Sequence, residues 1–165
     1  KEGAAPAIHA IGDRAVELSV NAVKTLRKER GCSAPVRIEH AQFISKEAAF
    51  TAKDAGITLS MQPNFSTDSE IYTDRLPRGF AALNNPFRML IDEAGFIPGK
   101  DLIFGSDGMP HGIMPALNAA LFPPFPGQAL SVPEFIEGYC IKDMENEWIA
   151  GFEGGKLKVS RLHDV

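Results

Sequence analysis

Three residues whose side chains can bind a metal ion or move a proton lie at the ends of apolar runs. His9 and His40 each close a short apolar run, and Asp107 follows another after a Gly-Ser pair. Neutral imidazole nitrogens and carboxylate oxygens together suit zinc and related divalent ions. The same side chains act as general acids and bases in enzymes. His9, His40 and Asp107 are therefore the candidate functional residues, provided that the fold brings them together.

Apolar runs alternate along the chain with segments of helical periodicity. The expected elements, in chain order, are a short apolar run at 6–9, a helix at 13–30, a strand at 36–40, a helix from 45 to 55, a strand at 57–61, a polar loop at 64–78, a helix at 87–93, a strand at 102–104, and helices at 116–121 and after 131. A helix after each strand is typical of parallel strands joined by crossover helices. The carboxyl ends of such strands form the active edge of α/β proteins, so the three candidates are expected to meet there.

Capping residues and apolar periodicity define the expected ends and faces of the helices. Asp13 is expected to cap the first helix and Gly31 to end it. Ser45 and Ser131 are expected to cap two later helices, the second with Glu134 in its first turn. The apolar face of the first helix is expected to contain Val16, Val20, Val23, Ala15, Ala22 and Leu26.

Each candidate residue also has a purely structural interpretation. A histidine at a strand end can hydrogen-bond a neighbouring loop, and an aspartate after Gly-Ser can cap the next segment. The occurrence of all three at the same end of successive strands favours a shared function. Glu39 precedes His40 and points to the opposite face of its strand, so it is predicted to be structural.

Length and composition restrict the classes of protein to which the chain can belong. A chain of 165 residues with 44% apolar residues is expected to form one globular domain. Its net charge of −4 argues against a nucleic-acid partner, and no apolar run reaches the roughly 20 residues of a membrane span. No apolar signal segment follows Lys1, and the two cysteines form no disulfide framework. The expected location is the cytoplasm, without membrane or nucleic-acid partners.

Four short motifs occur in the order and at the spacing of a known family. They are His-Ala-Ile-Gly-Asp-Arg-Ala at 9–15, Arg-Ile-Glu-His-Ala-Gln at 37–42, Met-Gln-Pro at 61–63 and Phe-Gly-Ser-Asp at 104–107. Through these motifs the chain resembles the amidohydrolase superfamily, in particular amidohydrolase family 3, which includes N-substituted formamide deformylases. The resemblance extends over most of the chain.

The resemblance implies the α/β fold of a partial TIM (β/α)8 barrel. On this mapping the chain contains the last four βα units, whose strands five to eight end at His9, His40, Met61 and Asp107. Residues 1–122 would be the carboxyl-terminal half of the barrel. Residues 123–165 would be a closing helix and a truncated tail that leads to a small β-sandwich domain.

The resemblance also implies a metal-dependent hydrolase that acts on carbon–nitrogen bonds other than peptide bonds. The substrate would be a small amide, formamide or cyclic amide. His9, His40 and Asp107 would bind a divalent metal, expected to be zinc. Asp107 would accept a proton from the attacking water, and His40 would bind a second ion or polarise the carbonyl oxygen of the substrate.

One departure from the family leads to a further expectation. The family carries a His-x-His pair on its first strand, and this sequence contains none. The chain alone is therefore expected to be an inactive fragment that binds metal weakly or not at all. The alternatives are a non-catalytic α/β binding module of flavodoxin-like shape, or a deaminase or phosphoesterase of the same superfamily. Half a barrel would expose two sheet edges, so a homodimer or higher oligomer is expected.

Overall fold

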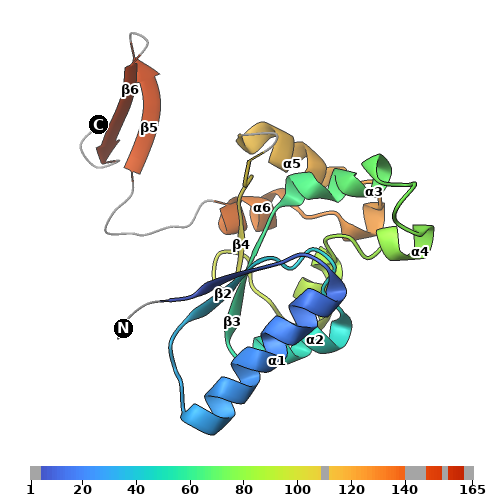
Figure 1. Cartoon of the computed structure of the whole chain (residues 1–165). Helices are drawn as coiled ribbons and strands as arrows, with labels where there is room; N and C mark the ends of the chain where they lie inside the picture. The colour runs from blue at the N-terminus through green and yellow to red at the C-terminus, as the bar shows by residue number, and fades with distance from the viewer. Residues whose placement is uncertain (1–4, 109–111, 140–147, 154–155, 162–165) are drawn as a thin grey trace.

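A four-stranded parallel sheet forms the centre of the chain. The computed structural model describes residues 5–108, 112–139, 148–153 and 156–161. The sheet has the order β1-β2-β3-β4, and its strands are β1 (Ala7–Ala10), β2 (Val36–His40), β3 (Ile57–Met61) and β4 (Leu102–Phe104) (Figure 1). All three strand pairs are parallel. The predicted α/β class with parallel strands is confirmed, and the run at 6–9 is the strand β1.

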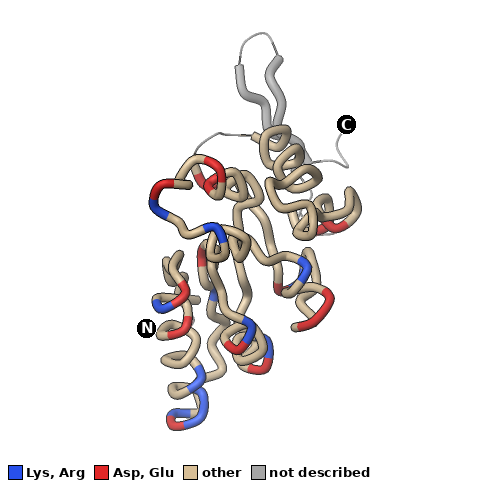
Figure 2. The backbone as a smooth tube through the Cα atoms, turned by 90° about the vertical axis from the view of Figure 1, so that its right-hand side faces the viewer, with Lys and Arg blue, Asp and Glu red and all other residues tan. Residues whose placement is uncertain are grey.

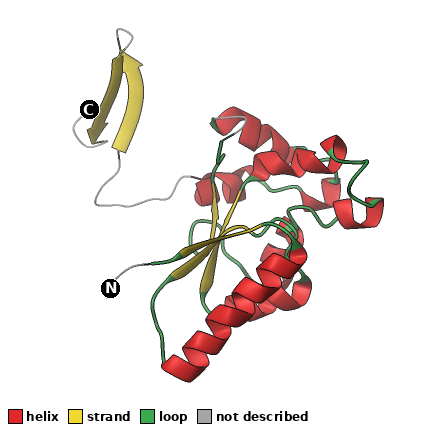
Figure 3. Cartoon of the chain, in the orientation of Figure 1, coloured by secondary structure: helices red, strands yellow, loops and turns green. Residues whose placement is uncertain are grey.

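Helices connect the strands and follow the last of them (Figure 3). They are α1 (Asp13–Arg30), α2 (Lys46–Asp54), the 3-10 helix η1 (Pro63–Thr67), α3 (Asp68–Ile71), α4 (Arg78–Ala81), the π-helix η2 (Met89–Glu93), α5 (Ile113–Leu121), the 3-10 helix η3 (Pro126–Gln128) and α6 (Val132–Tyr139). The prediction of a polar loop over 64–78 was wrong, since most of this segment forms η1 and α3. Such one-turn helices are too short to show an apolar period.

The two faces of the sheet have different surroundings. Side chains that alternate along the strands are buried on the face covered by α1 and α2 (Val36, Ile38, Ile57, Leu59, Met61, Leu102 and Phe104). The intervening side chains, on the other face, are half-buried or exposed (Arg37, Glu39, Thr58, Ser60 and Ile103). Glu39 forms an ion pair with Arg37 on this second face. The structural role predicted for Glu39 agrees with this position.

Helix α1 packs on the sheet through a narrower stripe than the sequence indicates. Its buried residues are Val16, Val20 and Val23. The predicted apolar face also included Ala15, Ala22 and Leu26, which are exposed. Because β1 is an edge strand, α1 lies at the margin of the sheet, where one row of side chains is enough to fill the contact.

The helix ends follow local side-chain chemistry, with one correction. Gly12 occupies the N-cap of α1, so the prediction of Asp13 as the cap was wrong by one position. Gly31 ends α1 at φ 60°, and its N–H donates to the Arg27 carbonyl. Ser45 caps α2 as predicted, since its Oγ accepts the Ala48 N–H at 3.2 Å. Side-chain oxygens at this position satisfy N–H groups that have no partner within the helix.

Ser131 caps α6 as predicted, and Glu134 in the first turn caps it in return, which was not predicted. The Ser131 Oγ accepts the Glu134 N–H at 3.4 Å, and the Glu134 carboxylate accepts the Ser131 N–H at 2.7 Å. Arg88, from the segment before β4, donates to the same carboxylate at 2.7 Å. This network joins α6 to the region of η2.

The carboxyl-terminal segment contains an antiparallel hairpin. Strands β5 (Trp148–Glu153) and β6 (Lys156–Arg161) pair in a register that places Trp148 opposite Arg161. The sequence analysis expected a tail here and did not predict the two strands. Residues 162–165, the end of the expected tail, lie outside the described residues. The division of the chain at 122 and 123 stays a prediction.

Charged residues of both signs are interspersed over α1 and α2, whereas the strands carry few (Figure 2). Several cations are paired with nearby acids, such as Lys46 with Glu93 and Lys53 with Asp101. The prediction that nucleic acid is not a partner stays a prediction. Among the described residues, no helix has the length and apolar character needed to cross a bilayer.

The contact between α6 and β4 gives a first testable prediction. A Cβ atom on Gly138 would lie 2.4 Å from two ring atoms of Phe104, whose ring packs against Phe87 and Phe135. Gly138→Ala should therefore lower the free energy of unfolding by about 1–3 kcal/mol in urea titrations. Gly79→Ala in α4 is the control, because its Cβ would meet no atom within 4 Å. Equal stability of the two variants would contradict this packing.

The reciprocal cap of α6 gives a prediction on pH. Burial raises the pKa of the Glu134 carboxyl, but hydrogen bonds from Ser131 and Arg88 outweigh burial, so the pKa lies below its ordinary value of 4.5. A carboxyl whose pKa is lower in the folded than in the unfolded state stabilises the fold above the unfolded pKa. The stability difference between the wild type and Glu134→Gln should therefore be constant near neutral pH and shrink as the pH falls below 4.5. Denaturant titrations over a pH series measure this difference, with the exposed Glu29→Gln as the charge-removal control. A difference that does not change with pH would contradict it.

Candidate functional site

The carboxyl-terminal edge of the sheet brings the three predicted residues together. His9 in β1 and His40 in β2 lie edge to face, with ring centroids 4.5 Å apart and an interplanar angle of 76°. The Nε2 atom of His40 is 4.0 Å from the Oδ2 atom of Asp107, which follows β4. The expected convergence of two imidazoles and one carboxylate is therefore present in the geometry. Their roles as ligands and catalytic groups stay predictions.

His40 is buried and its backbone is strained. The residue is 7% exposed, and its φ of 71° lies in the left-handed region, as does the φ of 46° at Ala41. A backbone of this kind in a residue other than glycine costs on the order of 1–3 kcal/mol and occurs most often at functional sites. The turn ends the extended conformation of β2, so strand alternation no longer determines where the His40 ring points.

Asp107 has the same kind of backbone but is open to solvent. Its φ is 51°, and its side chain is 57% exposed. The alternative interpretation of Asp107 as the cap of the next helix does not hold, because Gly112 is the N-cap of α5. The loop is anchored from β3, since the Gly105 N–H donates to the Met61 carbonyl at 3.1 Å. It is also held by the Asn64 amide, which donates to the Ser106 carbonyl at 3.1 Å.

Two further residues contact the His40 ring. The Oε1 atom of Gln62, directly after β3, lies 2.8 Å from the Nδ1 atom of His40. The Phe65 ring stacks on the imidazole, with centroids 6.0 Å apart and an interplanar angle of 18°. The sequence analysis quoted Gln62 within a motif but gave it no role. An amide cannot titrate, so the residue type alone carries no signal of chemistry.

A layer of buried amides and hydroxyls lies beneath this edge of the sheet. Asn85 donates from Nδ2 to the Gln62 carbonyl at 2.9 Å and to Ser66 Oγ at 3.0 Å. Asn84 donates to the Phe65 carbonyl at 2.9 Å, and Gln42 donates to Asp68 Oδ2 at 2.9 Å. These contacts hold η1 and α3 against the ends of β2 and β3. No role was predicted for Gln42, Asn84 or Asn85, because amide side chains do not titrate and these three lie outside the expected polar loop at 64–78.

A groove of about 380 Å³ is lined in part by residues that follow the two histidines in the sequence. Its lining includes Ile11 two residues after His9, Phe43 three residues after His40, and Tyr72 and Arg75 from beyond α3. The Arg75 guanidinium lies over the Tyr72 ring at 5.6 Å. Among its described lining residues, the groove offers apolar surface together with the cation Arg75 and the anion Asp68.

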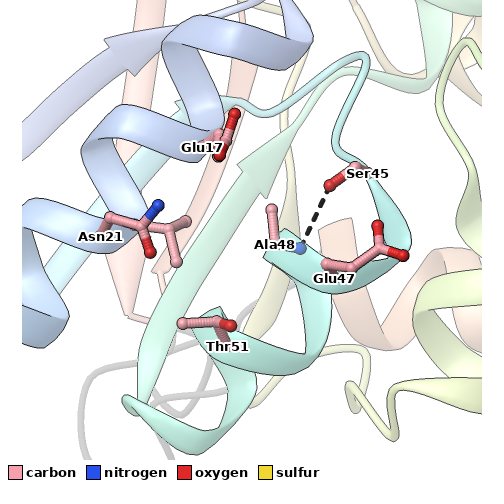
Figure 4. A pocket seen from close by; sticks show the side chains of 7 residues that line it. Glu17, Asn21, Ser45, Glu47, Ala48 and Thr51 are labelled. Carbon is pink, nitrogen blue, oxygen red and sulfur yellow. Dashed lines mark hydrogen bonds between the residues drawn. The ribbon is translucent and has the colours of Figure 1, made fainter.

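A second cavity, of about 420 Å³, lies between α1 and α2, away from the histidines (Figure 4). Glu17, Asn21, Ser45, Glu47 and Thr51 are among the residues that line it. Several of these side chains serve the helices themselves, as Ser45 does in capping α2. His9, His40 and Asp107 do not line this cavity.

The three candidate side chains offer donor atoms that a divalent ion can use. Two imidazoles and a carboxylate have the chemistry that zinc ligands require. Within the described residues, however, no group of three or more His, Cys, Asp or Glu side chains is close enough to hold a metal ion. The residues therefore suit a divalent ion in their donor chemistry, but within the described part of the chain they do not form a set that can hold one.

Comparisons with known proteins identify the fold. No family model matches the chain, and no curated protein matches it. An uncharacterized metal-dependent hydrolase from Pyrococcus furiosus is similar in structure, with a TM-score of 0.63, 26% identity and coverage of 81% of this chain and 27% of that chain. Another, from Pyrococcus horikoshii OT3, has a TM-score of 0.55, 25% identity and coverage of 72% and 23%. This chain therefore shares the fold of a part of these metal-dependent hydrolases. It spans much less than half of their length.

Proposed function

We propose that the chain belongs to a metal-dependent hydrolase that cleaves carbon–nitrogen bonds other than peptide bonds in small amides, formamides or cyclic amides. The observation that carries the proposal is the convergence of His9, His40 and Asp107 at one edge of a parallel sheet. The likeness to two metal-dependent hydrolases supports the metal-dependent hydrolase part of this proposal. The finer relationship, to amidohydrolase family 3 and formamide deformylases, rests on the four sequence motifs.

The proposed architecture is the last four βα units of a TIM barrel. The strand order is sequential, whereas a flavodoxin-like sheet reverses its order at a switch point. Right-handed crossovers between sequential parallel strands place the connecting helices on one face, as in a barrel. The open face that carries Arg37, Glu39 and Thr58 would then be the barrel interior.

The proposed chemistry distributes three roles over the site. A divalent ion, expected to be zinc, would supply Lewis-acid chemistry at this edge of the sheet. His9, His40 and Asp107 would hold it. The exposed carboxylate of Asp107 would accept a proton from the attacking water and pass it to the leaving nitrogen. His40, which is buried and in contact with the Phe65 and His9 rings, would bind this ion or a second one through its Nε2 atom.

The groove beside the site supports a substrate with an apolar substituent. Phe43 and Tyr72 would pack against the group attached to the amide, while the reacting carbonyl lies near His40. A phosphoesterase is disfavoured because Arg75 is the one cation among the described residues that line this groove. Deamination by the same residues is a further outcome that a substrate screen would reveal.

The chain is proposed to supply one part of the active site. Its sequence contains no His-x-His pair, and the described residues form an incomplete set of ligands. Residues 1–165 alone are therefore expected to bind metal weakly and to turn over little substrate. The incomplete set favours a non-catalytic α/β binding module as the second candidate function.

Asp107→Asn tests the proposed proton transfer. In the longest polypeptide that contains this sequence, the variant should lower kcat for N-formyl, N-acyl or cyclic amide hydrolysis about 10²–10⁴-fold, because it removes a general acid–base. Product formation is measured with added Zn²⁺ and with a chelator. Asp54→Asn, an exposed substitution at the last residue of α2, is the control. Unchanged turnover in Asp107→Asn would contradict the proposed role, and no hydrolysis in any form would favour the binding module.

Association through the sheet edges is a separate proposal. Strands β1 and β4 are the outer strands of the sheet, and unpaired edges favour pairing with another copy. Light scattering over a concentration series should show a dimer or larger species. Ala7→Lys, which puts a charge on the exposed part of β1, should shift it toward monomer, whereas Ala22→Lys on the exposed side of α1 should not. A monomer at all concentrations would contradict the proposal.

A further inference from the structure

We infer that Gln62 is a positioning residue, which holds neutral His40 in the tautomer that carries its proton on Nδ1. The Nε2 lone pair of His40 is then directed toward Asp107. The importance of this tautomer rests on the proposed function, because a metal ligand or a proton acceptor needs that lone pair. The tautomer itself is measurable without any turnover.

The orientation of the Gln62 amide follows from its second contact. Its Nε2 atom lies 3.3 Å from the Ser60 carbonyl oxygen, which can only accept a hydrogen bond. The NH₂ group must therefore face Ser60. The Oε1 atom is then the atom that faces His40 Nδ1, at 2.8 Å.

The position of the proton on His40 follows from the same rule about donors and acceptors. An amide oxygen donates no hydrogen, so a hydrogen bond of 2.8 Å to Nδ1 requires that Nδ1 be protonated. In a neutral imidazole, the hydrogen bond at one nitrogen thereby selects the state of the other. Nε2 is the unprotonated nitrogen, and it lies 4.0 Å from Asp107 Oδ2. Two groups with lone pairs thus face each other, which favours a cation or a shared proton between them.

Gln62 is itself held in place by hydrogen bonds to its backbone carbonyl. It is 5% exposed, and its backbone carbonyl accepts from Asn85 Nδ2 at 2.9 Å. The Asn85 N–H in turn donates to the Gln42 carbonyl at 2.8 Å. The Phe65 N–H also donates to the Gln62 carbonyl, at 3.0 Å, and the Phe65 ring stacks on His40. One short segment after β3 therefore sets both the hydrogen bond and the ring contact of the imidazole.

This assignment completes a pattern across the sheet. β1 provides His9, β2 provides His40, and the loop after β4 provides Asp107, while β3 ends in Met61, which is fully buried. Gln62, directly after β3, is the residue from this strand end that contacts His40. Outer partners that orient a metal-binding histidine commonly affect metal affinity or activity 10–100-fold when removed.

Long-range ¹H–¹⁵N correlation spectra of the imidazole rings test the inference. Spectra of the chain are recorded at alkaline pH, where imidazole is neutral. The His40 signals are identified by their loss in His40→Gln. We expect the cross-peak pattern of an Nδ1–H tautomer in the wild type and in Gln62→Glu, which keeps an acceptor oxygen. Gln62→Met removes the acceptor and should shift His40 to a mixture or to the Nε2–H form.

Gln42→Met is the matched control, because it removes another buried amide of the same layer that does not contact His40. The wild-type tautomer should persist in it. An Nε2–H tautomer in the wild type, or an unchanged Nδ1–H tautomer in folded Gln62→Met, would overturn the inference. If Gln62→Met does not fold, the wild-type and Gln62→Glu spectra decide the matter.

Zn²⁺ titrations of the same samples separate this inference from the proposed function. Gln62→Met should weaken any Zn²⁺ affinity 10–100-fold, and Gln62→Glu should restore it. If the wild type has the Nδ1–H tautomer but binds no Zn²⁺, even within a longer polypeptide, the proposed metal site is refuted. The positioning role of Gln62 then stays intact. An Nε2–H wild type that hydrolyses amides would refute the positioning role alone.

Discussion

The parallel alignment of four strands is the constraint on which the candidate site depends. Because all four strands run in one direction, their carboxyl ends lie at a single edge, and residues far apart in the sequence become neighbours there. The buried apolar face fixes the register, since a slip by one residue would turn Ile38 and Leu59 away from the helices. The same packing that stabilises the sheet therefore positions His9 beside His40.

Backbone strain is concentrated at this edge. Within the described residues, the positive φ angles outside glycine occur at His40, Ala41, Asn85 and Asp107. Asn85 donates to the carbonyl of Gln62, and the other three residues belong to the ends of β2 and β4. Each such conformation costs on the order of 1–3 kcal/mol, so the surrounding contacts must hold it. The buried amides provide these contacts, which explains why so many uncharged polar side chains lie next to a small number of titratable ones.

The sequence predicted the parts of the fold that depend on periodicity. Strands such as 57–61 alternate buried and half-buried residues, and Ser45 and Ser131 cap helices as expected. The segment from η1 to α4 was not predicted, because hydrogen bonds between distant side chains, such as Asn85 to Ser66, hold it rather than an apolar stripe. For the same reason the sequence indicated His9, His40 and Asp107 by residue type and position, but gave no sign of Gln62. Its role depends on an acceptor oxygen whose direction only the folded chain defines.

The sheet face that α1 and α2 do not cover determines what kind of surface can pack against it. Arg37 and Glu39 neutralise each other there, and Thr58 and Ser60 add hydroxyl groups rather than an oily surface. A paired charge is far less costly to remove from water than a lone one, provided that its remaining hydrogen-bonding groups find partners. This surface can therefore stay hydrated by itself or be enclosed by polypeptide that brings its own donors and acceptors. A polar surface of another polypeptide therefore fits this face better than an apolar surface does.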